Sequence, residues 1–286
     1  MTIQQAQQQL RFQLNHIYSD SESNNIADWV MEHITGLPRI DRVVNKKIPL
    51  IPAQISQLAS IQTQLLEHKP IQYILNECWF YGMKLFVDEN VLIPRPETEE
   101  LVDWVVKDVK RSGKSTLKIL DIGTGSGCIP LAIKKSLPDA EVYGLDISEG
   151  ALTVARKNAQ MQNLSIHLLH VDILSGETPS GIPRFDIIVS NPPYIPLGDK
   201  DSMAENVLKY EPWLALFVHD ADPLKFYKSI TDFSKGNQSE KGLLYFETHE
   251  HYAPVIAKFL INQNYKEVET RDDLQGKTRF VRAQRN

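Results

Sequence analysis

The chain has 286 residues, of which 42% are hydrophobic and 23% are charged, and its net charge at pH 7 is −5. This balance is typical of a soluble globular protein with one or two domains, and the acidic total argues against a protein whose main partner is a nucleic-acid backbone. The two cysteines, Cys78 and Cys128, have no spacing that indicates a disulfide framework or a zinc site. No apolar run approaches the ~18 residues of a membrane-spanning helix, and the glutamine-rich start contains no secretory signal, so we predict a cytoplasmic protein with no membrane partner.

Residues 1–72 are predicted to form a small all-helical domain. Apolar residues recur every three or four positions within residues 3–17, 21–35 and 55–66, which is the spacing of one helix face. Gly36 and Pro38 provide a stop after the second of these helices. Nothing in this segment resembles a catalytic constellation.

Residues 73–97 are predicted to link this domain to the rest of the chain. They contain the aromatic, β-prone stretch CWFYGMKLFV, whose central glycine suggests a hairpin. The prolines of LIPRPET stiffen the following segment, and Thr98 is expected to cap a helix that starts near Glu99. Arg95 and Glu97 are candidate substrate-binding residues, although the charges of an ordinary linker explain them equally well.

Residues 98–286 alternate between β-prone and helical segments. The β-prone runs begin near residues 118, 141, 165, 185, 242, 265 and 279. This alternation predicts an α/β domain with a doubly wound, mostly parallel sheet of seven strands. Residues 199–212 form a long polar insertion after the central strand, and a loop of that length beside a site is often a lid or a substrate-binding segment.

The sequence DIGTGSG, residues 121–127, lies between the first strand and the first helix of this predicted sheet. Its glycines let the backbone pass close to a ligand, and the following helix start presents free N–H groups. The third glycine of a dinucleotide fingerprint is missing, because Cys128 occupies its position, and the Gly-Lys-Ser of a phosphate loop is also absent. With Asp121 ahead of it, the loop resembles that of S-adenosylmethionine (SAM) methyltransferases.

Polar side chains also follow the next strands of the predicted sheet. Asp146 ends the second strand, where a carboxylate can accept both ribose hydroxyls, and Asp172 and Ile173 follow the third. Each aspartate alone is more often a strand-end or helix-capping residue. Together they are expected to converge on one crevice. The predicted cofactor-binding residues are Asp121, Gly123, Thr124, Gly125, Ser126, Gly127, Asp146, Asp172, Ile173 and Asn191.

The stretch FDIIVSNPPY, residues 185–194, is predicted to be a buried strand that runs into a stiff polar turn. The two prolines end the strand because they have no N–H to donate, and Asn191 is forced toward an extended conformation by the proline that follows it. Open α/β sheets bind their ligands at such strand ends. Taken alone, a proline-terminated strand with a surface tyrosine explains the stretch equally well.

The tetrapeptide Asn-Pro-Pro-Tyr after such a glycine loop resembles the amino-methyltransferases, which methylate an sp² nitrogen of adenine, cytosine or glutamine. The helical N-terminal domain, LIPRPETE at residues 92–99 and YEP at residues 210–212 are similar to the release-factor glutamine methyltransferase family, and the resemblance covers essentially the whole chain. The family implies transfer of a methyl group from SAM, without a metal, to the glutamine of the Gly-Gly-Gln motif of class-1 peptide release factors. It also implies that S-adenosylhomocysteine is the product and that the helical domain helps to hold the release factor. The resemblance puts the adenine near Asp172, where Ile173 replaces an aromatic residue that is frequent in the family.

An amide nitrogen is a poor nucleophile, because its lone pair is delocalised into the carbonyl group. We expect the Asn191 side-chain oxygen and the Pro192 carbonyl to accept hydrogen bonds from its two N–H bonds, and Tyr194 to stack on the amide plane. Catalysis would then rest mainly on positioning for an in-line displacement. The predicted catalytic residues are Asn191, Pro192 and Tyr194. The predicted substrate-binding residues are these three with Pro193, Arg95 and Glu97.

Two alternatives stay open from the residues themselves. A nucleic-acid adenine or cytosine methyltransferase uses the same tetrapeptide, but base-flipping enzymes need a basic groove, and no Lys/Arg-rich segment lies near Asn191. A non-catalytic SAM-binding protein would have no need of the loop from Asn191 to Tyr194. We therefore predict a monomeric methyltransferase domain at residues 98–286 that acts on a release factor, without direct contact to nucleic acid.

Overall fold

The computed structural model describes residues 1–114 and 116–286, which fall into two compact units. The helical unit comprises Met1–Asn76 together with Ala204–Tyr210, and the sheet unit comprises Glu77–Met203 together with Glu211–Asn286. No helix within the described residues is both long enough and apolar enough to cross a membrane.

The helical unit is built around the apolar faces that the sequence predicts. Thr2 caps the first helix, since its hydroxyl oxygen accepts a hydrogen bond from the Gln5 N–H, and Gly36 ends the second helix with a φ of 67°. Two short helices, α3 and α5, were not predicted, because a periodicity of 3.6 residues is not visible over one turn. The helices of this unit are α1 (Ile3–Leu14), α2 (Asp20–Thr35), α3 (Arg39–Val44), α4 (Pro52–Leu66), α5 (Ile71–Leu75) and α9 (Glu205–Tyr210).

The polar insertion at residues 199–212 is not the single long loop that the sequence suggested. It overlaps a 3₁₀ helix, η1 (Leu197–Ser202), and contains α9. The hydroxyl group of Tyr210 donates a hydrogen bond of 2.9 Å to the Glu67 carbonyl oxygen. Ala204–Tyr210 of the insertion therefore belong to the helical unit, although most of that unit lies far earlier in the chain.

The sheet unit contains one large sheet, which confirms the predicted fold class. Within the described residues it has seven strands in the order β10-β11-β9-β6-β3-β4-β5, and β11 is antiparallel to its neighbours. The strands are β3 (Lys118–Ile122), β4 (Glu141–Asp146), β5 (His167–His170), β6 (Phe185–Ser190), β9 (Gln238–Glu247), β10 (Lys266–Asp272) and β11 (Thr278–Gln284).

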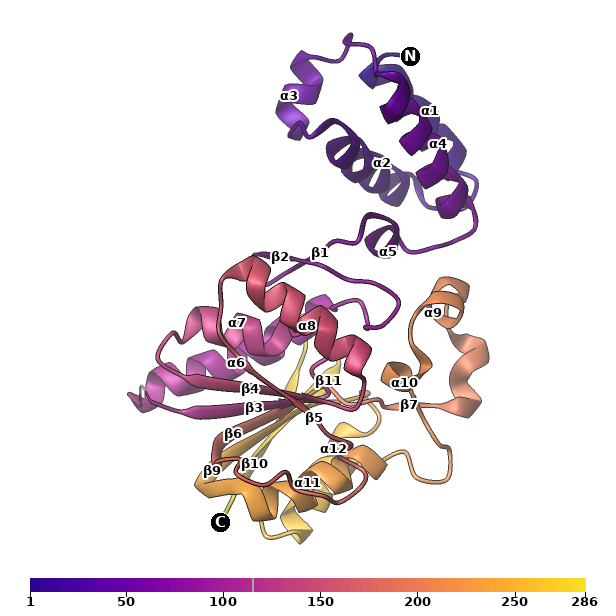
Figure 1. The fold of residues 1–286 in the computed structure, drawn as a ribbon. Helices are drawn as coiled ribbons and strands as arrows, with labels where there is room; N and C mark the ends of the chain where they lie inside the picture. Colours follow the sequence, from indigo (N-terminus) through magenta and orange to yellow (C-terminus); the bar gives the residue numbers. More distant parts are fainter. Residues whose placement is uncertain (115) are drawn as a thin grey trace. The chain divides into compact units, whose positions relative to one another are not determined.

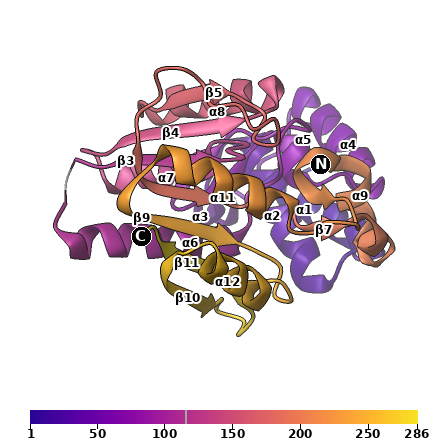
Figure 2. The same ribbon diagram turned by 90° about the horizontal axis from the view of Figure 1, so that it is seen from below.

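Helices cover both faces of this sheet, as Figures 1 and 2 show. One face packs against α6 (Pro96–Ser112), α7 (Cys128–Ser136) and α8 (Glu149–Gln162). The other face packs against α11 (Lys225–Asn237) and α12 (Ala253–Asn262). Because both faces are buried, the central strands are nearly continuous apolar runs, as parallel strands usually are.

Short elements complete the sheet unit. The predicted hairpin forms, with Tyr81 and Gly82 at positive φ in its turn. A second small pair of strands joins the segment after the Asn-Pro-Pro-Tyr loop to a later part of the chain. These elements are β1 (Cys78–Phe80), β2 (Met83–Leu85), β7 (Ile195–Pro196), α10 (Trp213–Leu216) and β8 (Phe217–Val218).

The prediction that Thr98 caps a helix is wrong. Helix α6 begins at Pro96, and Arg95 is its N-cap residue without a capping hydrogen bond from its side chain. Proline favours the first helical position, because its fixed φ suits the helix and no N–H is lost there. Thr98 therefore lies inside the first turn, buried, and its hydroxyl group donates a hydrogen bond of 2.8 Å to Glu247.

Asn158, a fully buried residue of α8, holds three segments of the sheet unit together. Its side-chain N–H groups donate to the carbonyl oxygens of Phe86 and Ser126, both at 2.9 Å. Its side-chain oxygen accepts from the Phe86 N–H at 2.6 Å. One amide group therefore fixes the segment after the hairpin and the glycine loop against the same helix.

We predict that Asn158→Ala lowers the free energy of unfolding by ~2–4 kcal/mol, because it leaves buried backbone groups without partners. Chemical denaturation monitored by circular dichroism measures this change. The matched control is Gln160→Ala on the exposed side of the same helix, which should change stability by less than about 0.5 kcal/mol. Equal effects of the two substitutions would contradict the assignment.

Candidate active site

The candidate site lies at the carboxyl ends of β3 and β6, where the connections of the sheet change direction. From β3 the chain continues through β4 to β5 on one side, whereas β6 lies on the other side and pairs with β9. Ligands of open α/β sheets bind at such a point. Ile122 and Ser190, the last residues of the two strands, are paired across the sheet, so the loops that follow them start side by side.

A cavity of about 190 Å³ opens at this point. Its lining includes eight of the residues predicted from the sequence, which come from the ends of four parallel strands. These residues are Gly123, Gly125, Asp146, Asp172, Ile173, Asn191, Pro192 and Pro193.

The glycine loop wraps closely around the end of β4. The N–H groups of Gly123 and Thr124 both donate to the Leu145 carbonyl oxygen, at 2.8 and 3.0 Å. Gly127 has a φ of 78°, and a Cβ atom there would lie 3.1 Å from the Cβ of Ala155 on α8. Gly127 is therefore needed for backbone conformation and helix packing, and it does not line the cavity.

Asp146 is the predicted ribose-binding residue, and two backbone groups fix its carboxylate. Its oxygens accept hydrogen bonds from the N–H groups of Gly125, at 2.8 Å, and Ser148, at 2.9 Å. Burial raises the pKa of this carboxyl above its ordinary value, and these N–H groups oppose the rise. The carboxylate is thus held at the cavity wall with lone pairs left to accept further hydrogen bonds.

Asp121 lies in β3 directly before the loop and is fully buried. Neither of its carboxylate oxygens has a hydrogen-bond partner at normal geometry within the described residues. Burial raises the pKa of Asp121 to about 7; the Thr124 side chain opposes the rise, and the charge of Asp146 adds to it. Thr124 and Ser126 are also buried and, like Asp121, do not line the cavity.

The far wall of the cavity is apolar, and most of it was not predicted. Asp172 uses one oxygen to accept the Leu174 N–H at 2.8 Å, which fixes the turn after β5 beside Ile173. The other apolar side chains of the lining were not predicted as site residues, although Leu92 opens the LIPRPETE stretch. They include Val91, Leu92, Leu214, Ala215, Phe226 and Ile230. Only the fold brings these scattered apolar residues together, so sequence spacing carried no signal for them.

Asn191 follows β6 with its side chain tied to α6. Its amide nitrogen donates to the Thr98 hydroxyl oxygen at 3.2 Å. Tyr194 does not line the cavity; its ring lies 6.2 Å from that of His249, centroid to centroid. Burial raises the pKa of Tyr194 to about 12, so its hydroxyl group is neutral at physiological pH.

Arg95 and Glu97 do not line this cavity. Arg95 forms an ion pair of 2.6 Å with Glu211, whose side chain is 1% exposed and also accepts the Ile93 N–H at 3.3 Å. This contact joins two segments that each contribute to the cavity wall, through Leu92 and Pro212. The geometry therefore gives Arg95 a structural role beside the cavity.

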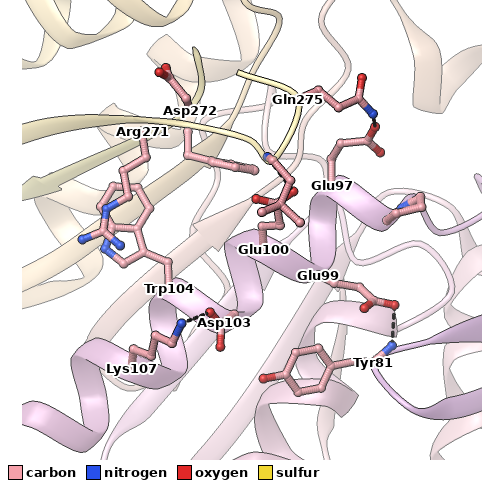
Figure 3. Close-up of a pocket in the computed structure, with 13 residues that line it drawn as sticks. Tyr81, Glu97, Glu99, Glu100, Asp103, Trp104, Lys107, Arg271, Asp272 and Gln275 are labelled. Carbon is pink, nitrogen blue, oxygen red and sulfur yellow. Dashed lines mark hydrogen bonds and ion pairs between the residues drawn. The ribbon is translucent and has the colours of Figure 1, made fainter. Parts of the chain in front are cut away.

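Glu97 lies at a second, wider cavity of about 660 Å³ between α6 and the connection from β10 to β11 (Figure 3). It accepts a hydrogen bond of 3.5 Å from Gln275. The other acidic side chains there include Glu99, Glu100 and Asp103. Each of these has a partner: the N–H groups of Tyr81 and Leu274 and the ammonium of Lys107, respectively.

A doubly wound sheet with a glycine loop after its first strand and Asn-Pro-Pro-Tyr after its fourth defines a Rossmann-like methyltransferase. Two family profiles match: the PrmC N-terminal domain at residues 5–75 and the methyltransferase small domain at residues 102–210. The catalytic domain of human Mettl16, solved with the MAT2A 3′UTR hairpin 6, superposes with a TM-score of 0.56 at 17% identity, covering 82% of each chain. That likeness shows the fold alone.

Full-length relatives narrow the class. The release factor glutamine methyltransferase of Flavobacterium psychrophilum is 42% identical over 94% of both chains. The enzyme of the same name from Bacteroides thetaiotaomicron is 38% identical over 96% of this chain and 98% of its own. The chain belongs to the release factor glutamine methyltransferase family.

We predict that Asp146→Ala weakens SAM binding by ~1–3 kcal/mol, because ribose hydroxyls would lose a buried acceptor. Isothermal titration calorimetry with SAM measures the change. Asp139→Ala, an exposed aspartate just before β4, is the matched control and should leave the affinity unchanged. Unchanged affinity in the Asp146 variant would remove this residue from the site.

Proposed function

We propose that this protein transfers a methyl group from SAM to the side-chain amide nitrogen of the glutamine in the Gly-Gly-Gln motif of class-1 peptide release factors. The observation that carries the proposal is the Asn-Pro-Pro-Tyr loop at the cavity of a chain that belongs to this family over nearly its whole length. The relatives are named release factor glutamine methyltransferases, which supports a release-factor glutamine as the acceptor. We expect the reaction to take place in the cytoplasm.

The residues present fit SAM. Its adenine suits the apolar wall around Ile173 and Phe226, and its ribose suits the fixed carboxylate of Asp146. SAM is a cation at its sulfonium and its ammonium groups, and the unpaired, buried carboxyl of Asp121 supports binding of a positive ligand beside the loop. When bound, SAM supplies an electrophilic methyl carbon, and no step of the proposed reaction calls for a metal.

Positioning is the main task left to the chain's own residues. We assign Asn191 and the carbonyl group of Pro192 to accept hydrogen bonds from the two N–H bonds of the substrate glutamine, with Pro193 and Tyr194 shaping the same loop. The nitrogen then attacks the methyl carbon, the carbon–sulfur bond breaks, and the nitrogen loses one proton to solvent. Acceptors at these positions stabilise the positive charge that develops on the nitrogen.

We predict that Asn191→Ala lowers kcat by about 100-fold, the loss typical of one preorganised electrostatic contact, and changes SAM affinity much less. Steady-state kinetics with purified release factor and calorimetry with SAM separate the two effects. Near-normal turnover combined with lost SAM binding would reverse the assigned role.

The substrate is tested with radiolabelled SAM and three acceptors in parallel. We expect label in an intact class-1 release factor and none in the same factor with its Gly-Gly-Gln glutamine changed to alanine. Duplex DNA is the third acceptor, because a nucleic-acid methyltransferase would use the same loop. Label in DNA, or equal label in both release factors, would contradict the proposal. The monomeric state stays a prediction, which light scattering on the purified protein would check.

A further inference from the structure

We propose that Thr98 and Glu247 are positioning residues that hold the Asn191 amide in the one orientation that presents its oxygen to the substrate. The inference rests on the proposed function and adds two residues to it. Neither was a predicted site residue, and neither lines the cavity.

The three side chains come together because of the sheet. Glu247 ends β9, the strand next to β6, and the pairing of Ser190 with Phe246 places Glu247 level with Asn191. Thr98 reaches them from the first turn of α6. Thr98 and Glu247 are 3% and 2% exposed, so water does not compete for their hydrogen bonds.

The chemistry of the donors fixes the direction of this chain of hydrogen bonds. An ionised carboxylate only accepts, so the Thr98 hydroxyl must donate its single proton to Glu247, at 2.8 Å. The Thr98 oxygen can then only accept from Asn191, at 3.2 Å, and Asn191 must turn its NH₂ group toward it. The Asn191 oxygen, on the opposite corner of the amide, therefore points away from Thr98.

This orientation matters for the proposed reaction. A substrate amide nitrogen carries two N–H donors, and it needs an acceptor beside it. A flipped Asn191 would present its own NH₂ group instead, which opposes substrate binding and leaves the developing charge without stabilisation. An isolated asparagine samples both orientations, whereas the buried hydroxyl and carboxylate select one.

The backbone of Glu247 is itself held from two sides. The Tyr227 hydroxyl on α11 donates to its carbonyl oxygen at 3.2 Å, and the next residue, Thr248, donates its N–H to the Arg279 carbonyl oxygen at 2.8 Å. The Arg279 guanidinium is committed to Asp273, at 2.9 Å. The backbone at Glu247 is thus fixed, and among the described residues its carboxylate bonds to Thr98 without an ion pair of its own.

The protonation state of Glu247 gives the arrangement a measurable signature. Burial raises its pKa to about 7; the Thr98 hydroxyl and the charge of Arg279 on β11 oppose the rise, Glu97 on α6 adds to it, and the Asn191 amide opposes it. Besides burial, the charge of Glu247 contributes to the raised pKa values of Tyr194 and Tyr227, which keep both hydroxyl groups neutral. Above about pH 7 the ionised carboxylate accepts a hydrogen bond from the Thr98 hydroxyl group. Below that pH a protonated Glu247 can donate a hydrogen bond to the Thr98 oxygen. The hydrogen bonds from Asn191 through Thr98 to Glu247 can then run in the opposite direction.

The first test compares Thr98→Val, which removes the hydroxyl group at constant volume, with Thr98→Ser, which keeps it. We expect Thr98→Val to lower kcat by about 10- to 100-fold, with the KM for release factor and the Kd for SAM changed by less than about 3-fold, and Thr98→Ser to recover most of the rate. Thr231→Val is the matched control and should retain normal kcat, because in the described part of the chain the hydroxyl group of this buried threonine donates to the Tyr227 carbonyl oxygen of its own helix.

The second test uses Glu247→Gln and the pH dependence of kcat between pH 6 and 8. In the unmodified protein kcat should fall as pH drops through about 7, since the amide substrate and Asn191 do not titrate in this range. In Glu247→Gln we expect a lower kcat and a clearly reduced low-pH limb. Asp121, whose pKa also lies at about 7, is unchanged in this variant and accounts for any fall in kcat that both proteins share. A thermal melt of each variant separates loss of positioning from loss of folding.

The outcomes are distinguishable. Normal kcat in a folded Thr98→Val variant, or an unchanged low-pH limb in Glu247→Gln, would overturn the positioning role while the methyltransferase reaction stands. If the unmodified protein transfers no label to a release factor, the proposed function fails, and the positioning role fails with it. If Thr98→Val does not fold, the pH profile of Glu247→Gln decides.

Discussion

The parallel pairing of β3 with β6 is the contact on which the site depends. Ile122 pairs with Ser190, and the Ser190 hydroxyl donates a hydrogen bond of 2.6 Å to the Ile122 carbonyl oxygen. Both strands therefore end at the same level, and both loops leave from one edge of the sheet. A slip of one residue in this pairing would carry Asn191 away from the level of the glycine loop and turn the side chains of β6 to the opposite face.

The same edge collects carboxyl groups whose burial is unfavourable to the folded protein. Burial raises the pKa of both Asp121 and Glu247 to about 7. These folded-state pKa values lie above those of exposed carboxyl groups. Each group therefore destabilises the fold more and more as the pH rises from the pKa of an exposed carboxyl group toward about 7, and above about pH 7 the loss of stability is complete. Such groups persist where they serve a site. A cationic ligand near Asp121 would reduce the penalty, so ligand binding and stability are expected to be coupled.

Local pattern was sufficient for the longer helices, for the seven strands of the doubly wound sheet and for the residues that follow β3, β4, β5 and β6, but not for short elements such as α3, α5 and α9. It was not sufficient for contacts between segments distant in the chain. Arg95 and Glu211 are 116 positions apart, and no periodicity links them. Likewise α9 follows the central strand in sequence but belongs to the helical unit. Pro96 and Thr98 both favour the start of a helix. The helix begins at Pro96, so the preference of proline for the first helical position outweighed the preference of threonine for the N-cap.

Glu247 also follows a pattern that indicates proximity to a site, namely a carboxylate at the end of a buried strand. The run GLLYFE ends a buried strand in a carboxylate, the same pattern that singled out Asp146. A charged side chain at the end of a parallel strand lies at the ligand edge of the sheet whether or not a motif accompanies it. The pattern does not supply the partner of Glu247, because Thr98 lies 149 positions away and its own sequence context predicts a helix cap. A strand-end carboxylate thus predicts proximity to a site, and only the donors around it decide whether it binds ligand or orients a neighbour.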